Sequence, residues 1–534
     1  MRSFAVKSKV IVMGVKEKPV KQLALISVSD KTGIVEFAQQ LVTKFDFEIV
    51  SSGGTAKKLQ EANIPVTKVS DYTGSPEILE GRVKTLHPRI HGGILARRDR
   101  ADDQTDLENN NIRPFDLIVV NLYPFVATIN KPDVTVAEAI ENIDIGGPAM
   151  LRAAAKNYQH LTVISNPQRY QAYLEELEAS GGKPSLTFRQ TCALETFTLT
   201  AEYDQAISAY LGGLTEEAAA PLPQEFSLMG TQRQVLRYGE NPHQAATWYQ
   251  TGVTPTGWAK ANQLQGKELS YNNLVDLEAA RRIINEFTDK PTVAILKHTN
   301  PCGIASHSQL CEAYKRAFAA DSVSAFGGIV AMNQAIDEAT ATEMTQTFLE
   351  CVVAPDCTPD AKKVLEKKSN LRVLIMPDLQ TGPKEMVKVI AGGFLVQAMD
   401  DVVDDPQQWE VVTEKQPSEE QLAEMVFAWK AAKHVKSNAI VLTRDRATIG
   451  VGAGQMNRVG ALEIAVKEAG EKTQGATLAS DGFFPFDDSV RMAAQAGIKT
   501  IIQPGGSRRD EDSIQAANEL GLVMICTGTR HFLH

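Results

Sequence analysis

Short apolar runs alternate with helical patterns along the first part of the chain. Between the runs, apolar residues recur at helical spacing over 34–42 and 56–62. Four runs have the length and apolar content of buried parallel strands: 23–26, 47–50, 117–120 and 161–164. Strands that alternate with helices in this way predict an α/β domain with a doubly wound parallel sheet.

The remainder of the chain is longer and contains a faint internal repeat. Helical patterns near 310–320 and 461–469 each precede an apolar run, at 325–330 and 479–484. Two similar α/β lobes that divide near residue 400 would account for both the repeat and the size of this region.

These patterns indicate where the domains begin and end, because 534 residues are too many for a single core. We expect a first domain at 22–212 and a larger region at 230–534. Residues 213–229 carry no periodic apolar face and are interpreted as a linker. Residues 1–21 contain only a short apolar patch, below the roughly 7–15 residues of a secretory signal, and are expected to be a disordered extension.

Composition narrows the class of protein. The chain is 43% hydrophobic and 22% charged, which is typical of globular proteins. Its formal charge of −10 argues against a general nucleic-acid-binding protein. No apolar run approaches the roughly 18–20 residues of a membrane span. The six cysteines form no C-x-x-C pair, which favours a reducing cytoplasm.

A lysine and a histidine follow the buried-looking strand at 293–296. At the carboxyl end of a parallel strand, Lys297 and His298 would face a ligand crevice, with Pro301 and Gly303 turning the backbone. A cation beside an imidazole can stabilise an oxyanion and transfer a proton. The alternative is a solvated lysine beside a structural histidine.

A zinc deaminase is a further alternative, because Pro301-Cys302 follows His298. The deaminase signature is H-x-E followed by P-C-x-x-C. Here the glutamate is missing and Ala305 stands where the second cysteine would be, so we do not expect a metal site.

Two strand–helix turns have the composition of phosphate cradles. S-G-G-T at 52–55 combines glycines and hydroxyls before a helix, and S-V-S-D-K-T-G at 27–33 adds a cation. Either turn alone is more often a simple helix cap, but two in one domain favour an anionic ligand. No G-x-G-x-x-G follows a strand, which disfavours a dinucleotide.

Further motifs continue in both regions. In the first domain they are G-R-V-K-T-L-H-P at 81–88, N-L-Y-P-F at 121–125, I-D-I-G-G at 143–147 and R-A-A-A-K-N at 152–157. In the second region they are R-Y-G-E-N-P-H-Q at 237–244, K-H-T-N-P-C-G at 297–303, S-N at 437–438, G-A-G-Q at 452–455 and R-H-F at 530–532. Together they resemble the bifunctional purine biosynthesis family, in family order over about 22–534.

The resemblance implies a fold and two activities. It implies a methylglyoxal-synthase-like first domain that acts as an inosine monophosphate (IMP) cyclohydrolase. Cytidine-deaminase-like lobes would then form the transformylase of the aminoimidazole carboxamide ribonucleotide (AICAR). This transformylase moves a formyl group from 10-formyltetrahydrofolate to the AICAR amine, and the cyclohydrolase closes the product, FAICAR, to IMP. A non-catalytic nucleotide-binding protein remains an alternative.

The resemblance also implies an assembly. It implies a cytoplasmic homodimer with its transformylase site at the subunit interface. Its ligands would be a nucleotide and a folate cosubstrate, with no tightly bound cofactor, no metal, no nucleic acid and no membrane.

For formyl transfer, the resemblance assigns three catalytic residues. His298 would accept or relay a proton, Lys297 would stabilise the oxyanion or protonate the folate nitrogen, and Asn438 would orient the formyl oxygen or carboxamide. Glu350 stands where relatives can carry Asp, so its carboxylate has a longer reach. The implied nucleotide-binding residues are Arg237, Tyr238, Gly327, Glu350, Arg530 and Phe532, and the implied folate-binding residues are Asn457, Phe484, Pro485 and Phe486.

For ring closure, the resemblance assigns four catalytic residues of the first domain. Lys84 and Lys156 would assist proton transfer, Tyr123 would donate to the carbonyl, and Asp144 would position the amide. The implied nucleotide-binding residues are Ser27, Lys31, Ser52, Gly53, Gly54, Thr55, Arg82, Thr85, Asn121 and Gly146.

Overall fold

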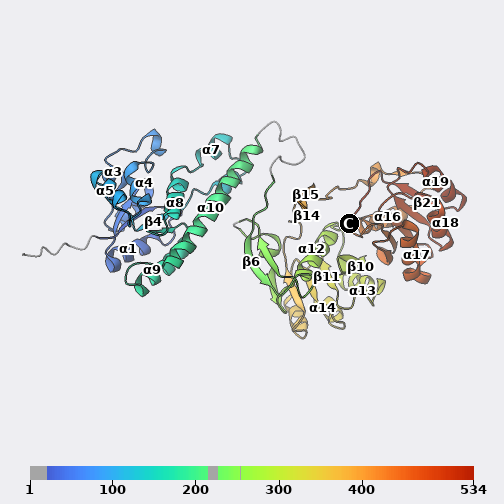
Figure 1. Ribbon diagram of the computed structural model, residues 1–534. Helices are drawn as coiled ribbons and strands as arrows, with labels where there is room; N and C mark the ends of the chain where they lie inside the picture. Colours follow the sequence, from blue (N-terminus) through green and yellow to red (C-terminus); the bar gives the residue numbers. More distant parts are fainter. Residues whose placement is uncertain (1–20, 215–225, 253) are drawn as a thin grey trace, which may run out of the picture. The chain divides into compact units, whose positions relative to one another are not determined.

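The structure is a computed structural model that describes residues 21–214, 226–252 and 254–534 (Figure 1). The chain divides into two compact units between Phe226 and Ser227. The predicted extension at 1–21 lies outside the described residues except for Lys21, as does most of the predicted linker at 213–229.

The first unit is built on a parallel five-stranded sheet with the order β3-β2-β1-β4-β5. Its strands are β1 (Leu23–Ser27), β2 (Glu48–Ser51), β3 (Thr67–Lys68), β4 (Leu117–Val120) and β5 (Thr162–Ile164). The strand order reverses between β1 and β4, as in a doubly wound sheet, and ligands bind at such reversals. The predicted doubly wound α/β domain is confirmed.

Both faces of this sheet are covered, because successive side chains of a strand point in opposite directions. In β4, Ile118 and Val120 belong to one core and Leu117 and Val119 to the other. The helices are α1 (Ile34–Phe45), α2 (Gly53–Glu61), α3 (Val69–Thr73), α4 (Pro88–Leu95), α5 (Ala101–Asn109), α6 (Phe125–Ile129), α7 (Val136–Glu141), α8 (Gly146–Lys156), α9 (Tyr170–Ala179) and α10 (Leu186–Gly212), with 3-10 turns η1 (Leu79–Gly81) and η2 (Pro167–Arg169).

The second unit contains a mixed twelve-stranded sheet with the order β16-β21-β20-β19-β17-β18-β10-β9-β11-β12-β13-β8. One half consists of β8 (Asn262–Gln265), α12 (Tyr271–Asn285), β9 (Thr292–Lys297), β10 (Asn300–Ser306), α13 (Leu310–Ala320), β11 (Ile329–Met332), α14 (Glu338–Met344), β12 (Cys351–Ala354), α15 (Pro359–Leu365) and β13 (Arg372–Ile375). The other half consists of β16 (Glu410–Val411), α16 (Glu419–Ala432), β17 (Ile440–Arg444), β18 (Ala447–Gly452), α17 (Arg458–Ala469), β19 (Thr477–Ser480), α18 (Asp488–Gln495), β20 (Thr500–Gln503), α19 (Asp510–Glu519) and β21 (Val523–Cys526).

The two halves repeat one order of elements: a strand, a helix, an antiparallel hairpin and three helix–strand pairs. The predicted repeat corresponds to α13–β11 and α17–β19, and the division into two separate lobes stays a prediction, because 227–534 form one compact unit. The halves join where β10 pairs with β18, at Ala305 and Ala447. One core, which includes Leu277 of α12 and Trp429 of α16, draws residues from both halves.

The remaining elements of the second unit are small. They are the hairpins β6 (Thr231–Leu236)–β7 (Ala246–Gln250) and β14 (Glu385–Ile390)–β15 (Gly393–Ala398), helix α11 (Gly257–Lys260), and the 3-10 turns η4 (Pro406–Gln408) and η5 (Gly470–Thr473). In the described parts of the chain, no helix has both the length and the apolar character needed to cross a membrane.

Candidate active sites

In the first unit, hydroxyl and amide side chains tie together the loops at the carboxyl ends of β1, β2 and β4. The hydroxyls of Ser27 and Ser52 lie 3.0 Å apart, and the Val28 N–H donates to Thr55 Oγ1 over 3.0 Å. Asn121 Oδ1 accepts from the backbone N–H of Ser29 over 2.6 Å. These loops, which the sequence predicted as anion cradles, therefore meet at the reversal of the strand order.

Two ammonium groups flank the glycine pair that opens α2. A Cβ at Gly53 would lie 3.8 Å from Lys84 Nζ, and one at Gly54 would lie 4.0 Å from Lys31 Nζ. Gly53 has φ 51°, in the left-handed region that favours glycine. Backbone N–H groups at a helix N-terminus, with two cations beside them, are suited to binding an anion.

Asp144 lies beside this cradle, at the start of α8. The Gly147 N–H donates to Asp144 Oδ1 over 2.8 Å, and the backbone N–H of Asp144 donates to the Tyr203 hydroxyl over 2.8 Å. Burial raises the pKa of Asp144, against the opposing effects of the Gly147 hydrogen bond, the Lys84 charge and the Tyr123 backbone N–H. A carboxyl group with a raised pKa can take part in proton transfer near neutral pH.

Thr85 and Gly146 complete the arrangement of the predicted residues around Asp144. A Cβ at Gly146 would lie only 2.8 Å from Thr85 Oγ1, so a side chain at this position would displace the Thr85 hydroxyl. The structure therefore brings Lys84, Thr85, Tyr123, Asp144 and Gly146 together.

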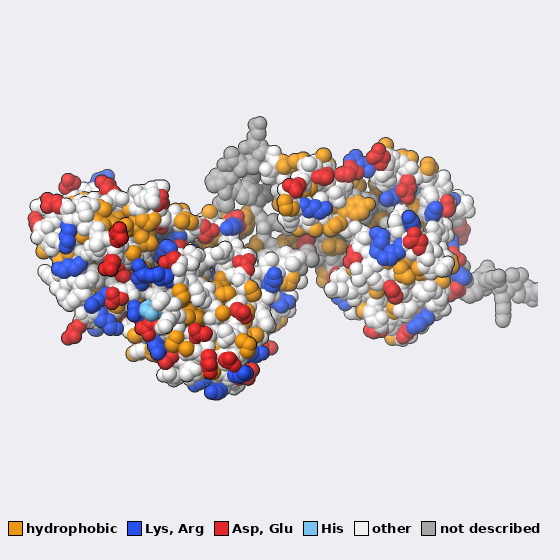
Figure 2. All heavy atoms as spheres, turned by 180° about the vertical axis from the view of Figure 1, so that it is seen from behind, with side chains coloured by type: hydrophobic (Ala, Val, Ile, Leu, Met, Phe, Trp, Pro, Cys, Tyr) orange, Lys and Arg blue, Asp and Glu red, His pale blue; other side chains and the backbone are white. Residues whose placement is uncertain are grey.

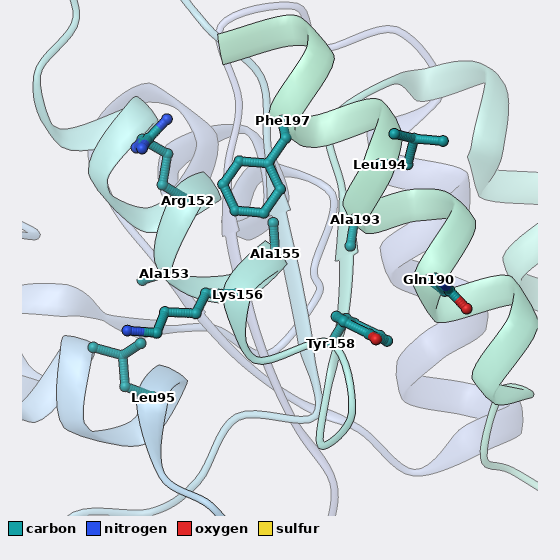
Figure 3. Close-up of a pocket in the computed structure, with 10 residues that line it drawn as sticks. All are labelled: Leu95, Arg152, Ala153, Ala155, Lys156, Tyr158, Gln190, Ala193, Leu194 and Phe197. Atoms are coloured by element: carbon teal, nitrogen blue, oxygen red, sulfur yellow. The ribbon is translucent and has the colours of Figure 1, made fainter. Parts of the chain in front are cut away.

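The side chains of two predicted residues of this unit make other contacts. The Arg82 guanidinium forms an exposed ion pair with Glu141 of α7. Lys156 is the last residue of α8, and the rise of about 1.5 Å per residue separates it from Gly146 by roughly 15 Å. It lines a pocket of about 630 Å³ with Leu194 and Phe197 of α10, none of whose lining residues is Lys84, Tyr123 or Asp144 (Figure 3).

In the second unit, the turn after Lys297 differs from the prediction. The residues Pro301 and Gly303 do not turn the chain, because 300–306 form strand β10, antiparallel to β9. The turn consists of His298 and Thr299, with φ 53° and 64°. Left-handed conformations at both positions match the right-handed twist of a two-residue hairpin, although such turns prefer Asn and Gly.

A half-buried carboxylate holds this turn in place and leaves His298 exposed. The Thr299 N–H donates to Asp276 Oδ1 of α12 over 2.7 Å. Burial raises the pKa of Asp276, and the nearby His298 and Lys297 act in the opposite direction. The sequence analysis missed Asp276 because a carboxylate in a helical pattern resembles a solvent-facing residue.

Lys297 is anchored to the loop before β11. Its Nζ donates to the carbonyl oxygens of Phe326 and Gly327 over 2.9 and 3.1 Å, which places the predicted Gly327 beside it. Glu350 immediately precedes β12, the strand beside β11, and its carboxylate accepts from Arg372 Nη1 over 2.8 Å.

Asn438 reaches the same area from the second half. The Lys436 N–H donates to Asn300 Oδ1 over 3.1 Å, which links the segment before Asn438 to the β9–β10 hairpin. Asn438 Nδ2 donates to the Gln455 carbonyl over 2.8 Å. Its Oδ1 accepts from Arg458 Nη2 over 2.9 Å, and Arg458 forms a buried ion pair with Asp481. The amide of Asn438 therefore has a defined orientation.

The predicted nucleotide-binding arginines each lie beside an aromatic ring. The Arg237 guanidinium lies 5.5 Å from the Tyr238 ring centroid, next to the β6–β7 hairpin. The Arg530 guanidinium lies 4.6 Å from the Phe532 ring in the C-terminal segment. No hydrogen bond or ion pair within the described ranges joins Arg237 to Lys297 or His298.

The predicted folate-binding wall needs a correction. Phe484 is fully buried in the core of the second half, so its side chain cannot form part of a surface. Pro485 and Phe486 are exposed, and the Arg509 guanidinium lies 5.1 Å from the Phe486 ring. Asn457 is exposed and caps α17, with Oδ1 accepting from the Gly460 N–H over 2.7 Å.

The structure gives the zinc-deaminase alternative no support. In the part of the chain that is described, no three His, Cys, Asp or Glu side chains form a group that could hold a metal ion. Burial raises the pKa of Cys302 to about 12, and its Sγ contacts the Ile295 carbonyl. A metal ligand would need the thiolate form.

The fold and sites thus define a two-unit α/β protein with an anion cradle in one unit and a Lys-His hairpin in the other. The family model "AICARFT/IMPCHase bienzyme" matches residues 154–468, and the model "MGS-like domain" matches 33–149. The chain is 67% identical to the bifunctional purine biosynthesis protein PurH of Rippkaea orientalis, over 96% of this chain and 100% of that protein. It is 68% identical to PurH of Gloeothece citriformis over the same shares.

The chain therefore belongs to the AICARFT/IMPCHase bienzyme family. It is a bifunctional enzyme of purine biosynthesis with AICAR formyltransferase and IMP cyclohydrolase activities. The crystal structure of ForH matches 36% of this chain and 100% of that chain at 34% identity, with a TM-score of 0.33, which is too low to bear on the fold.

Proposed function

We propose that the first unit closes the FAICAR ring at the carboxyl edge of its sheet. The observation that carries this proposal is the convergence of Lys84 and Asp144 beside the glycine pair that opens α2. The α2 N-terminus, Lys31 and Lys84 are suited to a nucleotide phosphate. Ser27, Ser52, Thr55 and Asn121 hold the loops in the shape that this binding requires.

Ring closure joins two groups of one molecule, so restricting its conformation supplies much of the rate. Asp144 accepts a hydrogen bond from the carboxamide and orients its nitrogen toward the formyl carbon. Lys84 neutralises charge on the formyl oxygen, and the partly exposed Tyr123 donates to it. We leave Lys156 out of this constellation because the length of α8 separates it from Asp144.

In the second unit, formyl transfer takes place at the β9–β10 hairpin with 10-formyltetrahydrofolate as cosubstrate. The AICAR amine is a weak nucleophile and needs a base for its proton, the role assigned to the exposed His298. Lys297, held on two carbonyl groups, stabilises the developing oxyanion. The fixed amide of Asn438 orients the formyl oxygen or the carboxamide. The Asn300–Lys436 hydrogen bond, which joins the two halves here, is the observation that carries this assignment.

The active form is a homodimer whose formyl-transfer site uses both chains. The proposed residues extend from Arg237 to Arg530, and no one half holds them all. The β14–β15 hairpin exposes Val389 and Leu395 by 83% and 57%, an apolar surface that suits a second copy of the chain. Formyl transfer per chain should therefore fall on dilution below the dimer dissociation constant while ring closure persists. A monomer with full transfer activity, identified by sedimentation, would refute the shared site.

The proposed ligands are small molecules, without a tightly bound cofactor, and the proposed location is the cytoplasm. Lys and Arg side chains are interspersed with Asp and Glu on the face that Figure 2 shows, rather than gathered in the basic stripe of a nucleic-acid-binding surface. All six cysteines are free thiols, which suits a reducing compartment.

A spectroscopic assay of both reactions tests the site assignments. Lys84→Met should slow ring closure by about 10²-fold or more, the usual effect of losing a positioned proton-transfer group, and leave formyl transfer intact. Lys57→Met, on the exposed side of α2, is the matched control and should affect neither reaction. Equal ring-closure rates in the two variants would refute the assignment. A fragment of residues 1–215 should close the ring without transferring formyl groups.

A further inference from the structure

The C-terminal segment after β21 has no helix or strand of its own, yet several hydrogen bonds fix its path. The Ser437 N–H donates to the Leu533 carbonyl over 2.9 Å, and the Leu533 N–H donates to Ser437 Oγ over 3.1 Å. The His531 N–H donates to the Asp481 carbonyl over 3.3 Å. This segment therefore lies against Ser437, the residue before the proposed catalytic Asn438.

The His531 side chain is 1% exposed and lies between two carboxylates. Its Nδ1 is 2.6 Å from Asp400 Oδ2 and its Nε2 is 3.0 Å from Asp404 Oδ2. Ionised carboxylates only accept hydrogen bonds, so both ring nitrogens must carry protons, and the ring is an imidazolium. Asp404 Oδ2 also accepts from Nε1 of Trp429 over 3.0 Å, and since Trp429 belongs to α16, this bond holds the carboxylate against that helix.

The charges around His531 favour this state. Burial lowers the pKa of His531, but its hydrogen bonds to Asp400 and Asp404 raise it to about 9. Directly after α16, Lys433 is paired with Glu286 over 3.0 Å and His434 contacts the same carboxylate over 3.2 Å. Burial lowers the pKa of His434, whereas the two carboxylates beside His531 raise the pKa of that residue.

Arg530 and Phe532, on either side of His531, are both exposed. His531 is buried while its two neighbours are exposed, so the anchored histidine leaves the side chains of Arg530 and Phe532 on the surface. Without such an anchor, the segment would become ordered only when the substrate binds. The conformational entropy lost at that moment would then weaken binding.

We propose that His531, clamped between Asp400 and Asp404, is a positioning residue that holds Arg530 and Phe532 at the nucleotide subsite of formyl transfer. This inference rests on the proposed function, in which these two residues bind AICAR. Asp400 and Asp404 belong to the connection between the two halves, so the clamp ties this connection to the substrate-binding segment.

The test compares His531→Gln with His434→Gln in the full-length chain. Both substitutions replace a buried histidine that contacts a carboxylate, but only His531 belongs to the C-terminal segment. His531→Gln should raise the KM for AICAR about tenfold or more, as expected when a charge-assisted contact is misplaced, with a smaller change in kcat and none in ring closure. His434→Gln should leave the KM for AICAR unchanged.

The pH profile separates positioning from general destabilisation. In the unaltered chain, the KM for AICAR should rise as the pH passes about 9. At that pH the His531 ring loses its proton, and with it the positive charge that holds it between the two carboxylates. In His531→Gln the KM should be high and show no such rise. An unaltered profile in His531→Gln would overturn the proposal.

Two further variants cover the other outcomes. If His531→Gln does not fold, Asp400→Asn/His531→Gln removes one of the two carboxylate charges that would lose their cation, and a normal KM for AICAR in this folded double variant would overturn the proposal. Arg530→Ala tests the site itself. If it leaves the KM unchanged, the proposed nucleotide subsite is wrong. If it raises the KM while His531→Gln does not, only the positioning role is wrong.

Discussion

The two halves of the second unit contain the same turn, but only one of the two turns carries the proposed catalytic residues. The β9–β10 turn uses His298 and Thr299, and the β17–β18 turn uses Asp445 and Arg446, all four with φ between 53° and 64°. In each half a half-buried helix carboxylate accepts from the backbone N–H of the second turn residue. Asp276 accepts from Thr299 and Glu424 accepts from Arg446, both over 2.7 Å.

The match extends to the positions of these carboxylates, since each is the sixth residue of its helix, α12 or α16. Burial raises the pKa of both. The left-handed turn with its half-buried carboxylate anchor is therefore a property of the repeated fold and is not in itself evidence of catalysis. What distinguishes the first half is the pair of side chains, Lys297 and His298, that it presents on this common scaffold.

The largest expected difference between the halves follows from replacing the first turn residue in each. His298→Asn should reduce formyl transfer by ~10²–10⁴-fold, because it removes the general base while asparagine tolerates the left-handed conformation. Asp445→Asn, the matched change in the other half, should leave the rate unaltered. Specific activities for both reactions provide the measurement. Equal transfer rates in the two folded variants would make His298 a structural residue.

A smaller difference is expected from the two anchors. Asp276→Asn should lower the rate of formyl transfer about tenfold. The turn would lose its charged hydrogen-bond acceptor, and His298 would then lose its fixed orientation. Glu424→Gln should cost stability but not activity, since its turn carries no proposed catalytic group. Steady-state kinetics and thermal unfolding of both variants separate these effects. A comparable loss of transfer in Glu424→Gln would mean that the anchors act through the shared core.

The smallest effect should be alike in the two halves. Thr299→Gly and Arg446→Gly each remove the strain of a non-glycine residue in a left-handed conformation. The opposing effect is the conformational entropy that glycine adds to the unfolded chain. We expect a net gain of about 0.5–1 kcal/mol in the free energy of unfolding for each. Calorimetric unfolding midpoints of the full chain test this. A lower free energy of unfolding for either variant would show that the original side chain stabilises the fold by more than its left-handed conformation destabilises it.

Much of the first unit could be predicted from sequence, because parallel strands that alternate with helices place their following loops at one edge of a sheet. Ser27, Ser52, Thr55 and Asn121 therefore met as expected. Lys156 did not join them. Its motif follows the Asp144 motif closely in sequence, but Lys156 is the last residue of α8 and Asp144 lies at the other end of that helix.

In the second unit the sequence by itself determined the repeat and the Lys-His motif, since both are local patterns of residue type. Only the tertiary structure decided that His298 and Thr299 form the turn, because strand register depends on partners far along the chain. It also placed Phe484 in the core and His531 between Asp400 and Asp404. Burial and charge pairing arise from contacts between distant segments, and a linear pattern of residues does not contain them.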